Sequence, residues 1–432
     1  EAEAIASIAV MEDQQHYPLS HAQKRLWVLD QMEVGQVSYN IPMVFELDEH
    51  VDEVKLQEAL KTLIARHESL RTVFPLVSGA PRQLVLEADQ ATIAFDFHDL
   101  RGVARSEDMA HDLVRVDRET PFDLANGPLL RTALIRISAD HHVFLINMHH
   151  IISDAWSMDV LFDELRSQVF DGIVKTDPLN IQYKDYTLWQ LDELGAGRME
   201  AHRKYWLDQF AEEIPLLELP TDYARPQFFA AAGATQAVNI SKEVKEGLLS
   251  LSRQVNGSLL IALEAIIKVL MYRYTGQHDI VLGTPVAGRD HSDLKDQIGF
   301  YVNTLALRTK IDGEHSFMAL LQQVQQETLQ AYDHQQYPFD ALVDELDLPR
   351  ETSRNPLFNV MFALFQDGKD DKAPSASDFE LDHTAAKFDL SFDLMEYEDG
   401  MVLSVNYTKS IFAAERISNL LRHFETLCES IV

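Results

Sequence analysis

The sequence has a single cysteine, Cys428, among 432 residues. One thiol cannot form a disulfide within the chain, so no internal disulfide framework holds this fold. Cys428 stands near the C-terminus in a helix-like stretch, which predicts a buried and chemically idle thiol. The chain also has no GxSxG segment. Without that segment, the nucleophile elbow of a serine hydrolase is absent.

Basic residues are scarce: 37 Lys and Arg stand against 69 Asp and Glu, which gives a formal net charge of -32. Such a surface repels phosphate backbones, so nucleic acid is not an expected partner, and the acidity is interpreted as a source of solubility. No apolar run approaches the roughly 18 residues of a membrane helix. The first residues, EAEAIASIAVMED, lack the basic region and apolar core of a signal peptide. We therefore predict a cytoplasmic protein that does not bind membranes.

Hydrophobic residues make up 46% of the chain and charged residues 25%, which is typical of a folded soluble protein. A chain of this length exceeds the usual size of one hydrophobic core. Helix and strand patterns alternate in both halves, so we predict an α/β fold with two lobes. The predicted division is a linker cut from a longer polypeptide at 1–16, an N-terminal lobe at 17–175 and a C-terminal lobe at 176–432.

Local patterns predict several elements along the chain. Apolar residues recur at helical spacing over 53–67, and the apolar run at 142–149 is typical of a buried strand. A helix is expected over 157–170, with Ser157 as its N-cap. The remaining expectations are a helix at 258–274, strands at 279–283 and 401–407, loops at 173–187 and 212–228, and a mobile surface loop at 366–380.

The residues between the predicted strand and the helix at 157 carry the densest chemical constellation, His149-His150-Ile151-Ile152-Ser153-Asp154-Ala155-Trp156. Successive side chains of a strand face opposite sides, so one histidine is expected to be reactive and the other structural. His150, at the strand end, can accept a proton near neutral pH, since the reference pKa of histidine is about 6.5. Asp154 either orients that imidazole or pairs with a distant arginine and holds the turn rigid.

Other interpretations of this constellation are simpler. Adjacent histidines occur as plain core or surface residues without any chemical role. A metal site is disfavoured because neighbouring strand histidines diverge and no third His or Cys stands nearby. On its residues alone, the constellation favours acyl transfer without excluding these alternatives.

Seven segments, taken in order, resemble the motifs of the condensation-domain family of nonribosomal peptide synthetases. They are SHAQKRLW (20–27), RHESLRTVF (66–74), MHHIISDAWS (148–157), YKDYTLW (183–189), IGFYVNT through Arg308 (298–308), HQQYPFD (334–340) and RETSRNPL (350–357). The resemblance covers nearly the whole chain. It implies two lobes, each similar to chloramphenicol acetyltransferase, that form a V-shaped pseudodimer with a central tunnel.

The resemblance also implies a reaction and its partners. The amine of an acceptor aminoacyl thioester attacks a donor acyl or peptidyl thioester, and an amide bond forms. No cofactor is bound tightly, because the phosphopantetheine arms of an upstream donor carrier protein and a downstream acceptor carrier protein deliver both substrates. An adenylation domain is expected next to this chain in the same polypeptide.

The resemblance assigns roles to residues at matching positions. His150, Asp154 and His149 form the catalytic motif, with Asp154 structural through a salt bridge, and backbone N–H groups of the turn stabilise the thioester oxygen. Substrate-binding positions are Ala155, Trp156, Arg66 and Asn303, and Arg71 and Arg308 are structural neighbours of the site. For Asn303, a local hydrogen-bonding role is the alternative.

Ala155 departs from the family pattern, which has glycine there. Alanine in a left-handed conformation costs roughly 1 kcal/mol. Either the turn has an ordinary φ in this chain, or the methyl group strains the turn and narrows the tunnel.

Two alternative functions share this fold. One is a non-catalytic interface domain that recruits a tailoring enzyme; such members usually lose the catalytic histidine, which this chain keeps. The other is a stand-alone acyltransferase that uses coenzyme A. Within the family, SHAQKRLW together with SYNIP at 38–42 is most similar to members that accept an L-configured donor.

Overall fold

The computed structural model describes residues 8–32, 37–47, 51–92, 94–175, 177–348, 351–366 and 385–432. The chain divides into two compact units. In the described residues, unit 1 comprises 8–198 and Ala287–Val302, and unit 2 comprises Met199–Val286, 303–366 and 385–432. Residues 367–380 of the loop predicted at 366–380, and Arg350 of the last motif, lie outside the described residues.

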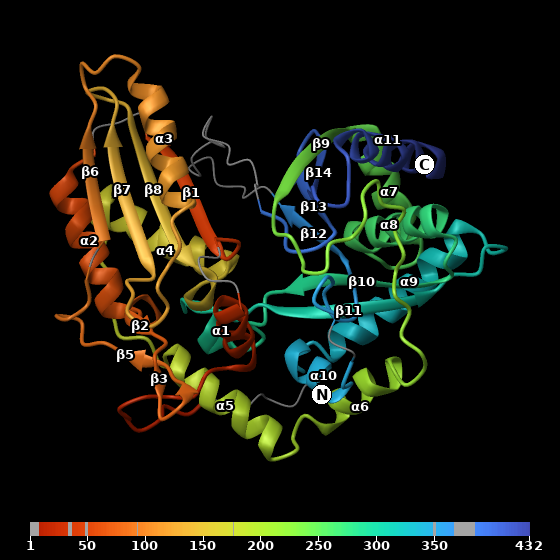
Figure 1. The fold of residues 1–432 in the computed structure, drawn as a ribbon, viewed down its shortest axis with the longest axis horizontal. Coiled ribbons are helices and arrows are strands. Elements are labelled where there is room, and N and C mark those ends of the chain that lie inside the picture. Colours follow the sequence, from red (N-terminus) through yellow and green to blue (C-terminus); the bar gives the residue numbers. More distant parts are fainter. Residues whose placement is uncertain are drawn as a thin grey trace. The chain divides into compact units, whose positions relative to one another are not determined.

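Unit 1 is built on a four-stranded mixed sheet in the order β1-β8-β7-β6 (Figure 1). Its main elements are α1 (His21–Met32), β1 (Asn40–Leu47), α2 (Glu53–Arg66), β6 (Ala94–Asp99), α3 (Ser106–Arg118), β7 (Leu130–Arg136), β8 (His142–His149), α4 (Ala155–Val169) and α5 (Tyr183–Gly195). Short pieces are β2 (Thr72–Val73), β3 (Leu76–Val77), β4 (Ala80–Pro81), β5 (Leu84–Val85) and the 3₁₀ turns η1 (Glu68–Arg71), η2 (His150–Ile152) and η3 (Ser292–Leu294).

Strand β8 is the centre of unit 1. Every one of its residues is buried, and it pairs antiparallel with β1 on one side and β7 on the other. Side chains of one face, such as Phe144 and Ile146, join the core that α2 and α4 complete, while α3 contacts β1 and β8. The predicted strand at 142–149 and the predicted helix at 53–67 are therefore confirmed.

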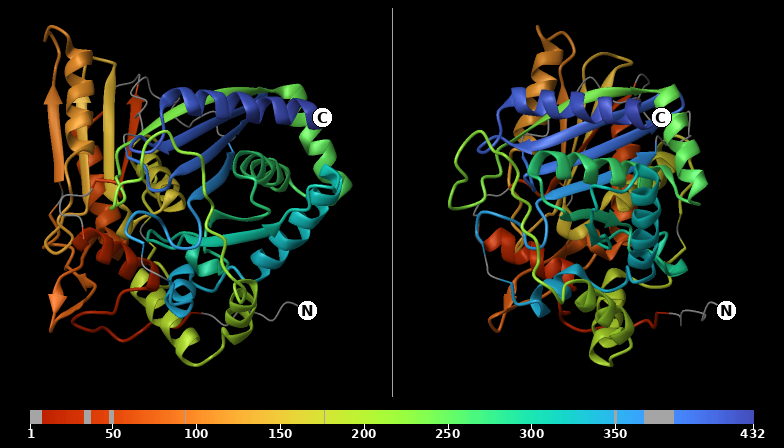
Figure 2. Two further views of the ribbon diagram at one scale, coloured as in Figure 1. Left: turned by 45° about the vertical axis from the view of Figure 1, so that its right-hand side comes forward. Right: turned by 90° about the vertical axis from the view of Figure 1, so that its right-hand side faces the viewer.

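Unit 2 is built on a six-stranded mixed sheet in the order β11-β10-β12-β13-β14-β9. Its elements are α6 (Glu200–Gln209), β9 (Gly233–Ser241), α7 (Lys242–Gln254), α8 (Leu259–Thr275), β10 (Asp279–Val286), β11 (Asn303–Lys310), α9 (Phe317–Asp333), α10 (Phe339–Glu345), β12 (Val360–Gln366), β13 (Leu390–Tyr397), β14 (Gly400–Thr408) and α11 (Ala414–Ile431). Figure 2 shows α8 beside the curved sheet, and the predicted helix at 258–274 and strands at 279–283 and 401–407 are all present.

The division between the units differs from the predicted one at residue 175. Helix α5 belongs to unit 1, and unit 1 also takes Ala287–Val302, which connects β10 to β11 of unit 2. The physical reason is packing: Tyr183 and Tyr186 of α5 are buried against Tyr301 and Ile8. Helix α4 ends at Val169 and α5 begins at Tyr183, so the predicted boundary falls in the connection between two helices of unit 1.

One further expectation needs correction, and another is met. The loop predicted at 173–187 ends early, because α5 begins at Tyr183, where Asp185 and Gln182 form a capping box. Ile8 is buried in unit 1 and the Met11 N–H donates to the Asp185 carboxylate (2.8 Å), so the predicted linker contacts unit 1 through these two residues. Cys428 is buried in α11 as expected, and burial raises the pKa of its thiol to about 12.

In the described part of the chain, no single helix has the length and apolar character needed to cross a membrane. By length and composition alone, α7 and α8 together match a broken span, but the chain bends by 100° between them.

Candidate active site

The His149–Ala155 segment lies where β8 gives way to α4, as the sequence predicts. Strand pairing ends at His149, which stands opposite Asn40 of β1. The N–H of His150 still donates to the Tyr39 carbonyl (2.9 Å), after which the chain tightens into η2. Asp154 then begins α4. The turn is therefore anchored at both ends by regular secondary structure, which positions its side chains firmly.

The two histidines have different surroundings. His149 is buried, with its ring near those of Phe122 (6.0 Å) and Tyr39 (6.3 Å), and its Nδ1 accepts the N–H of Ile151 (3.1 Å). Nδ1 of His149 is thus used inside the turn, which assigns this ring a structural role. Burial of the ring favours this structural role, and the catalytic role of His149 stays a prediction.

His150 is half-buried and its ring meets the edge of Phe300 at 4.8 Å. Nδ1 of His150 lies 2.8 Å from the Ser153 carbonyl oxygen. A carbonyl only accepts, so Nδ1 must carry the proton. In a neutral imidazole the second nitrogen, Nε2, is then the basic one. The turn therefore fixes both the orientation and the tautomer of the histidine that the sequence identified as reactive.

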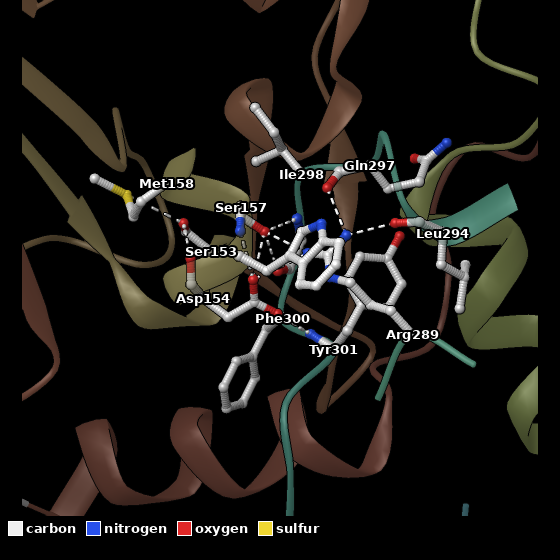
Figure 3. Close-up of polar contacts among 12 residues, drawn as sticks. Ser153, Asp154, Ser157, Met158, Arg289, Leu294, Gln297, Ile298, Phe300 and Tyr301 are labelled. Carbon is white, nitrogen blue, oxygen red and sulfur yellow. Dashed lines mark hydrogen bonds and ion pairs between the residues drawn. The ribbon is translucent and has the colours of Figure 1, made fainter. Parts of the chain in front are cut away.

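Asp154 is buried and uses both carboxylate oxygens (Figure 3). Oδ1 accepts from the Ser157 N–H (2.8 Å), the Ser157 hydroxyl (2.7 Å) and Nη2 of Arg289 (2.9 Å), and Oδ2 accepts the Tyr301 N–H (2.9 Å). Of the two roles predicted for Asp154, the structure shows the pairing with a distant arginine. It also corrects the helix start, because Asp154 and not Ser157 is the N-cap of α4.

Arg289 is the ion-pair partner of Asp154, and it was not identified from the sequence. Its side chain is 1% exposed, and Nη1 donates to the carbonyls of Leu294 (2.5 Å) and Gln297 (2.7 Å). The guanidinium therefore joins the turn after β8 to the Ala287–Val302 segment. Breaking a buried pair of this kind by removing one partner typically costs about 3–5 kcal/mol. The sequence around Arg289 contains no local signal for this pairing, which joins residues 135 positions apart.

Ala155 and Trp156 form the first turn of α4, and both are exposed. Ala155 does not have a positive φ, so the alanine that replaces the family's glycine causes no backbone strain. The indole N–H of Trp156 donates to the Lys295 carbonyl (2.9 Å). The methyl of Ala155 therefore changes the surface at the start of α4, and the backbone geometry stays ordinary.

Arg66 and Arg71 are occupied by other partners in unit 1. Nε of Arg66 pairs with Glu164 of α4 (3.3 Å), and Glu164 also bonds buried His67 (3.1 Å). Burial alone would raise the pKa of Glu164, but the His67 bond and the charges of Arg66 and Lys175 hold the pKa below its ordinary value. Arg71 donates to the Leu86 carbonyl, which fits the structural role predicted for it.

Asn303 and Arg308 belong to β11 of unit 2. The amide nitrogen of Asn303 donates to the carbonyls of Gln335 and Tyr337 (both 2.8 Å), and its oxygen accepts the Phe339 N–H (3.0 Å). Those bonds hold the start of α10 and favour the local role over substrate binding. Arg308 pairs with Asp279 (2.7 Å) and donates to two backbone carbonyls.

The described residues contain no group of three or more His, Cys, Asp or Glu side chains arranged to hold a metal ion.

Two mixed α/β units and a histidine turn after β8 are the features that the condensation-domain motifs predicted. The family model of the condensation domain matches residues 13–432, so the chain belongs to that family, as the motifs predicted. It is 39% identical to tyrocidine synthase 3 of Brevibacillus parabrevis over 99% of this chain and 6% of the synthase. It is 37% identical to surfactin synthase subunit 1 of Bacillus subtilis over 99% of this chain and 12% of that subunit. The chain thus spans a small fraction of these relatives.

Solved structures show the same fold. The X-domain in its complex with OxyB from teicoplanin biosynthesis matches with a TM-score of 0.87 at 24% identity, covering 100% of this chain and 96% of that one. A four-domain nonribosomal peptide synthetase bound to AMP and glycine matches with a TM-score of 0.84 at 23% identity, covering 99% of this chain and 34% of that one. The predicted α/β fold class is confirmed, and the V shape with a central tunnel stays a prediction.

Proposed function

We propose that this chain forms amide bonds: the amine of an acceptor aminoacyl thioester attacks a donor acyl or peptidyl thioester. Carrier proteins, upstream for the donor and downstream for the acceptor, present both substrates on phosphopantetheine arms. The chain would work within a cytoplasmic synthetase that also holds an adenylation domain. Membership of the condensation-domain family and the similarity to tyrocidine and surfactin synthases support this proposal.

The observation that carries the proposal is the hydrogen bond of His150 Nδ1 to the Ser153 carbonyl (2.8 Å). This bond makes Nε2 the basic nitrogen, which can accept a hydrogen bond from the attacking amine and take its proton as the C–N bond forms. The donor thioester loses its thiolate, which leaves with a proton. No covalent enzyme intermediate is required, since the thioester is already activated and tethering brings the two substrates together.

The negative charge that develops on the thioester oxygen needs hydrogen-bond donors. In the turn, the N–H groups of Ile151, Ser153 and Ser157 are already donated within the protein. The N–H groups of Ala155 and Trp156, in the exposed first turn of α4, are the donors that we assign to the oxygen. Asp154 and Arg289 are positioning residues that keep β8 and α4 in register for this task.

A reconstituted assay tests the proposal. Donor-loaded and acceptor-loaded carrier proteins are mixed with the chain, and acceptor-bound amide product is measured by mass spectrometry. We expect product from carrier-bound substrates and little from the same acyl groups on coenzyme A. Efficient use of coenzyme A substrates would favour the stand-alone acyltransferase. No product from any pair, with retained binding of a tailoring enzyme, would favour the interface domain.

A further inference from the structure

Several helices of unit 2 lie on one face of its sheet (Figure 1). Helices α7, α8, α9 and α11 all contact strands of this sheet, and Figure 1 shows α7, α8 and α11 on the same side of it. Phe392 of β13 points to that side, since its ring lies 6.5 Å from that of Phe424 in α11. Strand side chains alternate, so Ser391, Asp393 and Met395 point to the opposite face.

Strand register places three rows of side chains on that opposite face. In the middle row, Asp393 stands between Ala363 of β12 and Ser404 of β14, and Ala237 of β9 follows Ser404. One neighbouring row is mostly polar and the other mostly apolar. The first contains Met361, Ser391, Asn406 and Thr235, and the second contains Phe365, Met395, Val402 and Asn239. We call these three rows the Asp393 patch.

The Asp393 carboxylate is poorly compensated. Among the described residues, it takes part in no hydrogen bond and no ion pair; the single charge acting on it is that of Lys387, at longer range. Burial raises the pKa of Asp393 to about 6, and burial lowers the pKa of Lys387 to about 8. Asp393 is half-buried, and titratable groups whose pKa values are shifted in this way concentrate at binding sites.

Short side chains stand on both sides of this carboxylate. Directly opposed residues of paired strands have Cβ atoms about 5 Å apart, so Ala363 and Ser404 place no large side chain directly beside the carboxylate. The apolar row lies two residues further along each strand, about 7 Å away. This distance matches the length of a short methylene chain. Such a chain could extend from the carboxylate and contact Phe365, Met395 and Val402.

We propose that the Asp393 patch binds the aliphatic ammonium side chain of one of the two acyl units, as in a lysine-like or ornithine-like residue. The identity of this ligand as a substrate rests on the proposed function. The ammonium group bonds the Asp393 carboxylate with help from Ser391 and Ser404, and the methylenes cover the apolar row. A neutral side chain of equal length leaves the carboxylate unpaired and is disfavoured.

Calorimetric titration tests this inference without requiring turnover. The ligands are stable amide analogues of lysyl-N-acetylcysteamine and of norleucyl-N-acetylcysteamine, which match in length and differ in the ammonium group. We expect wild type to bind the lysyl analogue at least 10-fold more tightly. Asp393→Asn should bring the two affinities within about 2-fold, which corresponds to a loss of about 1 kcal/mol or more.

Two variants keep the test decisive. Asp399→Asn, in the exposed turn after β13 where Asp399 pairs with Lys242, should keep the full preference. Ser404→Lys supplies an internal ammonium group beside Asp393 and should abolish the preference even if Asp393→Asn folds poorly.

Equal binding of both analogues by wild type, or a preference that survives in a folded Asp393→Asn or Ser404→Lys, would overturn the inference. A failed carrier assay alongside an Asp393-dependent preference would refute the proposed function and leave the patch standing.

Discussion

Two aspartates, one in each unit, show how differently a carboxylate can be used. Asp154 at the start of α4 receives four hydrogen bonds, one from Arg289. Asp393 on β13 has only the distant influence of Lys387 among the described residues. A fully satisfied carboxylate fixes a structure, whereas an unsatisfied one is available to a ligand. Mutations that remove the partners of Asp154 should therefore lower the stability of the fold. Neutralising Asp393 should leave the stability unchanged or raise it.

The largest effect on stability is expected at Arg289. Arg289→Met leaves Asp154 buried without its cation, and we expect the free energy of unfolding to fall by about 3–5 kcal/mol in urea titration. The matched control is Arg101→Met, whose pair with Asp99 is exposed (51% and 36%) and should contribute less than about 1 kcal/mol. Equal losses in both variants would contradict the account of Asp154 as a structural carboxylate.

Asn303→Ala should have the next largest effect. It removes three hydrogen bonds that hold the start of α10, so we expect a loss of about 1–3 kcal/mol in the same titration. The KM for the acceptor carrier should remain within about 2-fold of wild type. A raised KM at unchanged stability would restore the substrate-binding role predicted from the sequence.

Asp393→Asn should stabilise the chain at pH 7, by about 1–2 kcal/mol. The folded pKa of about 6 exceeds the ordinary value of 3.8, so the native state binds the proton more tightly than the unfolded state. The contribution of Asp393 to stability should therefore fall as pH rises from about 4 to about 6, and the gap between variant and wild type should widen over that range. Thermal unfolding across this range checks the slope, and the difference between wild type and the variant should vanish below pH 4. A constant difference at every pH would count against this assignment.

The smallest effect is expected at Ala155. Since Ala155 has no positive φ, glycine brings no relief of strain and removes a good helix former from the first turn of α4. We expect Ala155→Gly to cost about 0.5–1 kcal/mol and to change the condensation rate by less than about 3-fold. Stabilisation by glycine in a thermal melt would show that the alanine strains the turn.

Much of the site was predictable because it is local in sequence. A continuous apolar run specifies β8, and a histidine pair at its end followed by an aspartate specifies the turn. Two of its details, the N-cap at Asp154 and the structural role of His149, depend on hydrogen bonds within a few residues. The alternation of strand side chains predicted that the two histidines differ, and their neighbours decide which one is packed.

The remainder depends on contacts between residues far apart in sequence. Arg289 is separated from Asp154 by 135 residues, and nothing in its local sequence specifies that pairing. Helix α5 belongs to unit 1 because it packs against Tyr301. Local composition does not reveal this contact, so it could not place the boundary correctly. Similarly, Asp393 looks like an ordinary polar residue of an alternating strand until the register places Ala363 and Ser404 beside it. Tertiary contacts, and not local propensity, determine these features.

The most direct test of the central claim is a single-turnover measurement of His150→Ala with carrier-bound donor and acceptor. The account predicts a fall in rate of about 10²–10⁴-fold with an unfolding midpoint close to that of wild type, because His150 acts on the substrates and is only half-buried. A His150→Ala variant that stays folded and forms the amide at the wild-type rate would contradict it.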